Sequence, residues 1–135
     1  MGTVNKIFLE FEDLDFIPKN VYSIFIARKE PSQEWTSKIT GFAIVSPPAK
    51  NTLITWISGD AAREMESLND SEVVIGCMRI LRNALDNHNI PAPLNIVRSA
   101  WASNPYALGS YTYIPTGSSV ADIEALAKPI VGDND

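Results

Sequence analysis

Residues 3–11 read TVNKIFLEF, and apolar side chains recur at every second position through most of this stretch. Successive side chains of a β-strand point to opposite faces of its sheet, so the alternation predicts a strand with one apolar face. Ile7, Leu9 and Phe11 share that face, which we expect to be buried. The opposite face carries Val4, Lys6, Phe8 and Glu10.

Four other segments have the composition of strands. Each is short, rich in β-branched or aromatic residues and bounded by polar or turn-forming residues. They are residues 21–27, 39–45, 53–57 and 96–102. A polar loop, KEPSQEWTSK at residues 29–38, separates the first two. We interpret Trp35 as a residue of that loop and Trp56 as a core residue of its strand.

Two helices are predicted between the fourth and fifth strands. Residues 60–67 have the pattern of a short helix, and residues 69–72, NDSE, have the spacing of a capping box that begins a longer one. The longer helix is expected to end near Asn89 and Pro91, because proline cannot continue a helix. Its buried stripe is predicted to contain Val73, Val74, Cys77, Ile80, Leu81, Ala84 and Leu85.

The order of these elements is strands, helices, one strand, a loop and a closing helix over residues 121–128. Regular alternation of strands and helices, the signature of a parallel sheet, is absent from the pattern. The sequence therefore predicts an α+β fold with a mixed, largely antiparallel β-sheet of about five strands packed with helices. A chain of 135 residues has the size of one domain, so residues 1–135 are interpreted as a single domain.

The composition argues against several classes of partner. Eleven basic and sixteen acidic residues give a net charge of -5 without a cluster of Lys and Arg, so no nucleic acid is expected. No apolar run approaches the ~20 residues that cross a bilayer, so no membrane is expected. One cysteine, Cys77, and one histidine, His88, cannot assemble a Cys/His zinc site. The lone cysteine favours an intracellular protein, cytoplasmic first, with nuclear or peroxisomal residence as alternatives.

Residues 101–113, WASNPYALGSYTY, place four large aromatic side chains among small residues and turn formers. Asn104-Pro105 is typical of a turn, and Gly109 permits a tight backbone. The residues alone leave two interpretations open. The rings could pack in a core or loop with their hydroxyls bonded, or they could form a wall that faces a flat ligand or an amine. The four rings are Trp101, Tyr106, Tyr111 and Tyr113.

These residues resemble the FAD-dependent polyamine oxidases, a branch of the flavin-containing amine oxidases that includes the spermine oxidases. Residues 98–129, RSAWASNPYALGSYTYIPTGSSVADIEALAKP, are similar to the family pattern W-x-S-N-P-Y-x-R-G-S-Y-S-Y followed by G-S-S. GTVNKIFLEFE at residues 2–12 resembles the family's strand with an active-site lysine. ITWISGDAAREMESLNDSEV at residues 54–73 resembles its linking segment. The resemblance covers nearly the whole chain.

The resemblance implies roles for three residues at the reacting centre. Lys6 corresponds to the catalytic lysine, which in this family holds a water against the flavin N5. Trp101 corresponds to the tryptophan beside the flavin and that lysine. Tyr111 corresponds to the aromatic ring that frames the substrate amine next to the flavin. From its strand position alone, Lys6 could instead lie on an ordinary solvated face.

Further residues have less direct counterparts. Ser110 stands where monoamine oxidases carry a flavin-linked cysteine, so the resemblance implies a cofactor-binding position and a non-covalent FAD. Tyr106 and Tyr113 are placed in the same substrate-binding wall. Cys77 is expected in the core of its helix, and His88 at the surface or at the helix end.

Some features depart from the family pattern. Leu108 stands where the family usually has arginine, and Asp15-Phe16 replaces the usual Pro-Phe-Trp, which leaves the exact substrate open. The family's glycine fingerprint, Gly-x-Gly-x-x-Gly, and its Gly-Glu-x-Thr flavin segment are missing from the sequence. Residues 1–135 are therefore interpreted as part of a polyamine oxidase substrate-binding domain, without the FAD-binding domain, and the missing FAD-binding half is the expected protein partner.

The resemblance implies that the full-length parent oxidises a polyamine such as spermine or spermidine. The amine becomes an imine by hydride transfer to flavin, and oxygen becomes hydrogen peroxide. The fragment alone is expected to be inactive and without FAD. Two alternatives stay open: a non-catalytic module that binds amines, and part of a histone-lysine demethylase-like oxidase. The second branch usually has Asp-Pro-Trp where this chain has Asn104-Pro105-Tyr106.

Overall fold

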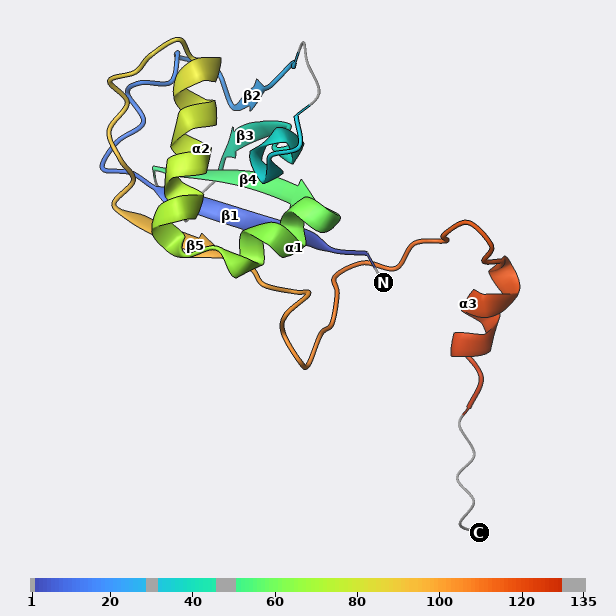
Figure 1. The fold of residues 1–135 in the computed structure, drawn as a ribbon. Coiled ribbons are helices and arrows are strands. Elements are labelled where there is room, and N and C mark those ends of the chain that lie inside the picture. Colours follow the sequence, from blue (N-terminus) through green and yellow to red (C-terminus); the bar gives the residue numbers. More distant parts are fainter. Residues whose placement is uncertain (1, 29–31, 46–50, 130–135) are drawn as a thin grey trace.

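The computed structural model of the chain describes residues 2–28, 32–45 and 51–129. Five strands form one antiparallel sheet in the order β2-β3-β4-β1-β5, and the helices α1 and α2 come between β4 and β5 in the chain, as the colours of Figure 1 show. The expected α+β fold and its largely antiparallel sheet are confirmed. The elements are β1 (Val4–Glu10), β2 (Ser23–Phe25), the 3-10 helix η1 (Trp35–Lys38), β3 (Gly41–Ile44), β4 (Thr52–Ser58), α1 (Asp60–Ser67), α2 (Asp70–Ala84), β5 (Asn95–Arg98) and α3 (Val120–Leu126).

The strand β1 is an interior strand of this sheet and lies between β4 and β5. It pairs with β4 along its whole length and with β5 along its second half. Burial alternates along it as predicted: Ile7 and Leu9 are fully buried and Lys6 is exposed. Because a shift of one residue would move every side chain to the opposite face, pairing on both sides fixes which face Lys6 occupies.

The core lies between one face of the sheet and the helices α1 and α2. Met65 of α1 and Val73, Cys77 and Leu81 of α2 are buried in one cluster with the apolar residues of β1 and β4. Apolar stripes on two helices therefore cover the apolar face of a sheet, which is the usual way such faces are removed from water. In Figure 1, no helix formed by the described residues lies over the other face of the sheet.

The sequence predicted most element boundaries within a few residues. The capping box at the start of α2 is present, with Glu72 N–H donating to Asn69 Oδ1 at 3.0 Å and Asn69 N–H donating to Glu72 Oε2 at 2.9 Å. The helix ends at Ala84, earlier than expected, and Ala84 is exposed. The second and fifth strands are shorter than predicted: the former spans Ser23–Phe25 and the latter ends at Arg98.

The two interpretations of tryptophans were wrong. Trp35, interpreted as a loop residue, begins η1 and is buried against α2. Trp56, interpreted as a core residue, is 41% exposed on β4 because it pairs directly with Lys6 and so lies on the outer face. Trp35 stands among polar neighbours and Trp56 among apolar ones, and these neighbours suggested the wrong environment for each ring. The burial of a side chain depends on the direction in which it points, not on its neighbours in the sequence.

Arg98 joins β5 to both helices, which the sequence gave no signal for. Its guanidinium donates to the carbonyl oxygens of Met65 and Leu68, both at 2.6 Å, where α1 ends. It also forms an ion pair with Asp70, in the first turn of α2, at 2.8 Å. Carbonyl groups at the end of a helix lack the usual partners within the helix, so this arginine supplies donors to them. Met65 O also accepts from Leu68 N–H at 3.3 Å.

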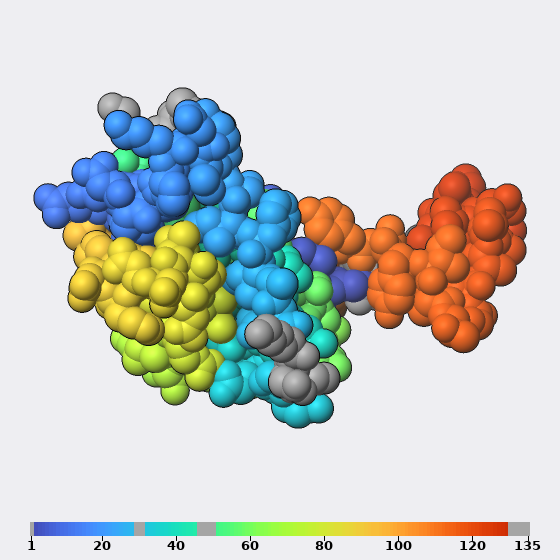
Figure 2. Space-filling model, turned by 90° about the horizontal axis from the view of Figure 1, so that it is seen from above, coloured from blue at the N-terminus to red at the C-terminus, as the bar shows by residue number. Residues whose placement is uncertain are grey.

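The end of the described chain lies apart from the sheet. Beyond residue 113, which still lies next to Gly2, the chain leaves the body of the molecule and forms α3, as Figures 1 and 2 show. The predicted closing helix is present, with a capping box between Ser119 and Asp122, but no residue of it is buried. Three apolar side chains of α3 are exposed: Val120, Ile123 and Leu126.

The packing of η1 on α2 makes Gly76 a sensitive position. A Cβ at Gly76 would lie 2.5 Å from Trp35 Cζ2 and 2.9 Å from Thr36 Cγ2, which is closer than real contacts allow. We predict that Gly76→Ala lowers the free energy of unfolding by about 1–3 kcal/mol through overpacking, although alanine improves helix propensity by about 1 kcal/mol. Urea unfolding followed by circular dichroism measures this.

The matched control is the double variant Trp35→Phe/Gly76→Ala. A smaller ring leaves room for the new methyl group, so the double variant is expected to lose less stability than the sum of the two single variants. If Gly76→Ala alone stabilises the chain, the close packing of η1 on α2 is contradicted.

Candidate functional site

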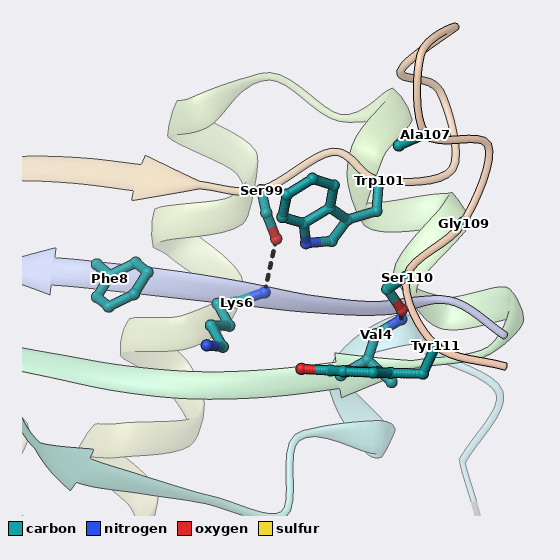
Figure 3. A pocket seen from close by; sticks show the side chains of 9 residues that line it. All are labelled: Val4, Lys6, Phe8, Ser99, Trp101, Ala107, Gly109, Ser110 and Tyr111. Carbon is teal, nitrogen blue, oxygen red and sulfur yellow. Dashed lines mark hydrogen bonds between the residues drawn. The ribbon is translucent and has the colours of Figure 1, made fainter.

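A hollow of about 500 Å³ lies at the end of the outer face of the sheet, where β1 meets the segment that follows β5. Small-molecule sites typically have volumes of ~300–1,000 Å³. Figure 3 shows the lining side chains, which come from β1 and from residues 99–111. The lining residues are Val4, Lys6, Phe8, Ser99, Trp101, Ala107, Gly109, Ser110 and Tyr111.

Lys6 extends from the middle of β1 into this hollow. Its backbone is held on both sides, by pairing with Trp56 of β4 and by two bonds to Ser99. Lys6 N–H donates to Ser99 Oγ at 2.9 Å, and Ser99 N–H donates to Lys6 O at 3.0 Å. The stem of the lysine therefore starts from a fixed point, while its amino group is exposed.

Trp101 stands on the other side of the hollow, and its side chain is directed toward the space beside Lys6 in Figure 3. It begins a compact loop that Gly109 closes by donating its N–H to Trp101 O at 2.8 Å. Asn104 organises the turn inside the loop, because its carbonyl oxygen accepts from Ala107 N–H at 3.0 Å and Leu108 N–H at 2.9 Å. The Asn-Pro turn predicted from the sequence is thus present.

Ser110 and Tyr111 are held against the start of β1. Gly2 N–H donates to Tyr111 O at 2.7 Å, and Ser110 N–H donates to Gly2 O at 2.9 Å. Val4 N–H donates to Ser110 Oγ at 2.7 Å, so the hydroxyl that we expected near the cofactor also anchors β1. These bonds place the Tyr111 ring at the same hollow as Lys6, although the two are more than a hundred residues apart in sequence.

Four of the six predicted site residues, namely Lys6, Trp101, Ser110 and Tyr111, therefore meet at one hollow. The structure does not bring the other two into that wall. Tyr106 lies at the tip of the loop and is 98% exposed, and Tyr113 lies beyond the hollow, next to Gly2 and among residues that lead to α3. The three tyrosines therefore do not share one wall in this chain, because the turn at Asn104 carries Tyr106 outward.

Sequence reasoning missed Ser99 and the apolar floor of the hollow. Val4 and Phe8 share the outer face of β1 with Lys6, so strand alternation alone carried the signal that they would line any site around the lysine. No pattern in the sequence distinguished Ser99, whose hydroxyl accepts from Lys6 N–H.

The remaining chemical groups lie elsewhere. Cys77 is fully buried in the helix stripe, as predicted, and burial raises the pKa of its thiol to about 12. His88 is exposed beyond the end of α2. Among the described residues no group of three or more His, Cys, Asp or Glu is placed to hold a metal ion. Within the same part of the chain, no helix is both long and apolar enough to cross a membrane.

Comparison with known proteins gives the family of this fold and site. The family model described as flavin containing amine oxidoreductase matches residues 1–134, and the chain belongs to this family. The human peroxisomal N(1)-acetyl-spermine/spermidine oxidase is 34% identical over 142 residues, which cover 98% of this chain and 28% of that protein. A Drosophila melanogaster protein described as a possible lysine-specific histone demethylase 1 is 33% identical over 135 residues, covering 96% and 14%.

Solved structures show the same fold. Cyclohexylamine oxidase from Brevibacterium oxydans IH-35A superposes with a TM-score of 0.68 at 20% identity, over 98% of this chain and 28% of that one. Putrescine oxidase bound to putrescine gives a TM-score of 0.60 at 19% identity, over 82% and 23%. The chain thus spans less than a third of the length of these relatives.

The family implies an FAD cofactor, and the residues of the hollow fit a flat ring. The hollow is lined by the indole of Trp101, the phenol of Tyr111 and apolar side chains of β1. Its polar groups are few, and Lys6 brings an exposed amino group to its edge. An open space with aromatic walls and one cationic group suits one side of a planar, partly polar heterocycle.

Leu108, at the position of the usual arginine, adopts a left-handed conformation with φ of 54°. This region costs about 1–2 kcal/mol for an L-residue with a bulky side chain, whereas asparagine tolerates it. Because Leu108 is largely exposed, little burial is lost on replacing it. We predict that Leu108→Asn raises the free energy of unfolding by about 1 kcal/mol, measured by urea denaturation.

The control is Leu94→Asn, which also removes an exposed leucine but is not at a position with positive φ. It should leave stability nearly unchanged. Equal effects of the two variants would show that backbone strain at Leu108 does not determine the stability of the loop.

Proposed function

We propose that this chain is the substrate-binding part of an FAD-dependent polyamine oxidase. The observation that supports the proposal is the meeting of Lys6, Trp101 and Tyr111 at one hollow on the outer face of the sheet. The human relative, whose name gives acetylated spermine and spermidine as substrates, and the putrescine oxidase fold neighbour favour polyamines as the substrate class. The polyamine oxidase name of an Arabidopsis thaliana relative agrees with this choice.

The reaction that follows is oxidation of an amine to an imine, which water hydrolyses to an aldehyde, with oxygen reduced to hydrogen peroxide. FAD, when bound, accepts the hydride from the carbon next to the amine nitrogen. Tyr111 would hold the neutral amine against its ring, since a carboxylate would favour the unreactive ammonium form. Trp101 would flank the flavin, and Lys6 Nζ would hold a water molecule in the hollow. Ser110 would contact the cofactor edge as well as β1.

The other cationic ends of the polyamine need partners too. An aromatic face that contacts a cation contributes about 0.5–2 kcal/mol of binding free energy. Tyr106 and Tyr113 precede and follow residues 107–111, a segment that contributes to the lining of the hollow, and both rings are exposed. We therefore propose them as outer contacts for these cationic ends and not as part of the inner wall. Two such contacts amount to about 1–4 kcal/mol, which corresponds to millimolar binding at best.

The chain by itself is proposed to bind FAD weakly and to lack oxidase activity, because the glycine fingerprint that holds the dinucleotide is not in the sequence. The FAD-binding half of the family is the proposed partner. We propose intracellular residence for the parent enzyme, with the peroxisome, named for the human relative, as one compartment.

A second candidate is a histone-lysine demethylase-like oxidase, which the Drosophila relative favours. The same hollow would then receive a methylated lysine of a peptide. A third is a module that binds amines without any flavin. These three differ in the ligand that the isolated chain prefers and in how tightly it holds that ligand.

Titration of the ¹⁵N-labelled chain with spermine, followed by NMR, tests the proposal. We expect saturable shifts at the Trp101 indole and at Tyr111 with millimolar affinity, and weaker shifts with a dimethyl-lysine peptide. Tyr111→Ala should abolish the shifts, while Tyr22→Ala, which removes an exposed tyrosine outside the hollow, should preserve them.

Submicromolar spermine binding would instead favour the flavin-free amine-binding module. Preference for the peptide would favour the demethylase branch. A stoichiometric yellow flavin that copurifies with the chain would contradict its proposed dependence on a second half.

The role of Lys6 is tested in the complete oxidase. We predict that Lys6→Met slows either flavin reduction or reoxidation by about 10²-fold or more in stopped-flow absorbance, because the variant keeps the stem but cannot hold the water. Lys38→Met, at an exposed lysine of η1, is the control. Unchanged rates of both half-reactions in Lys6→Met would remove the proposed role.

A further inference from the structure

A polar cluster lies behind the hollow, on the core side of β1. Asn5 neighbours Lys6 in the strand but points to the opposite face, and it is fully buried between the sheet and α1. Most other buried residues on this face of β1 are apolar. A buried amide must find partners for its oxygen and nitrogen, because an unpaired polar group in a core costs about 1–3 kcal/mol.

The oxygen of Asn5 binds the segment that carries the aromatic wall. Asn5 Oδ1 accepts from Trp101 N–H at 3.2 Å and from Ser99 Oγ at 3.0 Å. The same Ser99 hydroxyl accepts from Lys6 N–H at 2.9 Å. One amide group thus connects the backbone of the lysine to the backbone of the tryptophan.

The nitrogen of Asn5 binds Glu66, on α1. Asn5 Nδ2 donates to Glu66 Oε1 at 2.6 Å. Glu66 also accepts from the next two backbone groups of the wall segment, Ala102 N–H at 2.9 Å and Ser103 N–H at 2.7 Å. Burial raises the pKa of Glu66, but these hydrogen bonds outweigh it, so the net pKa of Glu66 lies below its ordinary value and the carboxylate is the favoured form.

Three consecutive backbone N–H groups, those of residues 101 to 103, are therefore all bound by two side chains from the body of the fold. The carbonyl oxygen of Trp101 is occupied by Gly109. The backbone N–H of Trp101, its carbonyl oxygen and the N–H of Ala102 are therefore all hydrogen-bonded. These bonds fix the orientation of the Cα–Cβ bond that carries the indole. Successive N–H groups also bind the Glu66 carboxylate strongly, because hydrogen bonds to a charged acceptor are stronger than those between neutral groups.

We propose that Asn5 and Glu66 are positioning residues, which set the Trp101 indole against Lys6 across the hollow. The importance of that geometry for oxidation rests on the proposed function, while the positioning itself can be measured without it. Neither residue lines the hollow, so each acts through the backbone of the wall segment. The proposal gives the buried asparagine on an otherwise apolar strand face a reason to be there.

The test uses Glu66→Gln in the ¹⁵N-labelled chain. Glutamine has the same shape but one acceptor oxygen, while three N–H donors converge on the carboxylate, so at least one donor must lose its partner. We expect amide exchange of Ala102 and Ser103 to accelerate at least tenfold and the Trp101 indole resonance to move. Amides of the core strands should keep their exchange rates.

The matched control is Glu64→Gln on the same helix, an exposed carboxylate with no hydrogen-bond partner in the described part of the chain. It should change neither the exchange rates nor the Trp101 resonance.

A second pair of variants tests the link to β1. Asn5→Asp alone brings two carboxylates together, whereas Asn5→Asp with Glu66→Gln restores a donor opposite an acceptor. The double variant should return the Trp101 resonance toward its wild-type position.

Equal exchange rates in Glu66→Gln and Glu64→Gln would overturn the proposal. So would a uniform acceleration across the core strands, which would reveal only a loss of global stability, or a double variant no closer to wild type than Asn5→Asp. Adding spermine to the same samples separates the two levels: if Glu66→Gln frees the loop but spermine never shifts Trp101 in the wild-type chain, the positioning stands and the proposed function fails.

Discussion

The antiparallel pairing of β1 with β4 and β5 is the constraint on which the rest of the structure depends. It divides the side chains of a single strand between two environments: Ile7 and Leu9 enter the core, and Lys6 and Phe8 form the floor of the hollow. A slip of one residue would bury a lysine and expose the core, so the hydrophobic effect that stabilises the domain also fixes the lysine in place. Stability and site thus come from one register.

The fold could be predicted well because its signals are local. Alternation identified β1, and the spacing of Asn69 and Glu72 identified the start of α2, since both depend on the few residues around them. Burial of the tryptophans could not be predicted in this way. Trp35 is buried because η1 packs on α2 at Gly76, and Trp56 is exposed because of the face that its pairing with Lys6 assigns to it. Both causes are tertiary.

The site was predicted only in part, because tertiary contacts also determine which side chains reach it. Resemblance to the amine oxidases pointed to Lys6, Trp101 and Tyr111, which share the hollow, but it gave no means of knowing that the turn at Asn104 directs Tyr106 into solvent. The supporting contacts were invisible as well. Asn5, Glu66 and Ser99 come from β1, α1 and the segment that follows β5, and only their long-range hydrogen bonds reveal that they belong together. In the sequence, nothing in their residue types distinguishes them from polar residues of the surface.

The central claim is that the lysine of β1 and the aromatic wall together form one face of a flavin site. Intermolecular NOEs from lumiflavin to the labelled chain test it most directly, because they report which protons lie within a few ångströms of the isoalloxazine ring. We predict contacts from the ring to the Trp101 indole, to Tyr111 and to the side chain of Lys6, and none to Tyr106. Contacts confined to other surfaces, or contacts to the aromatic wall that never include Lys6, would contradict it.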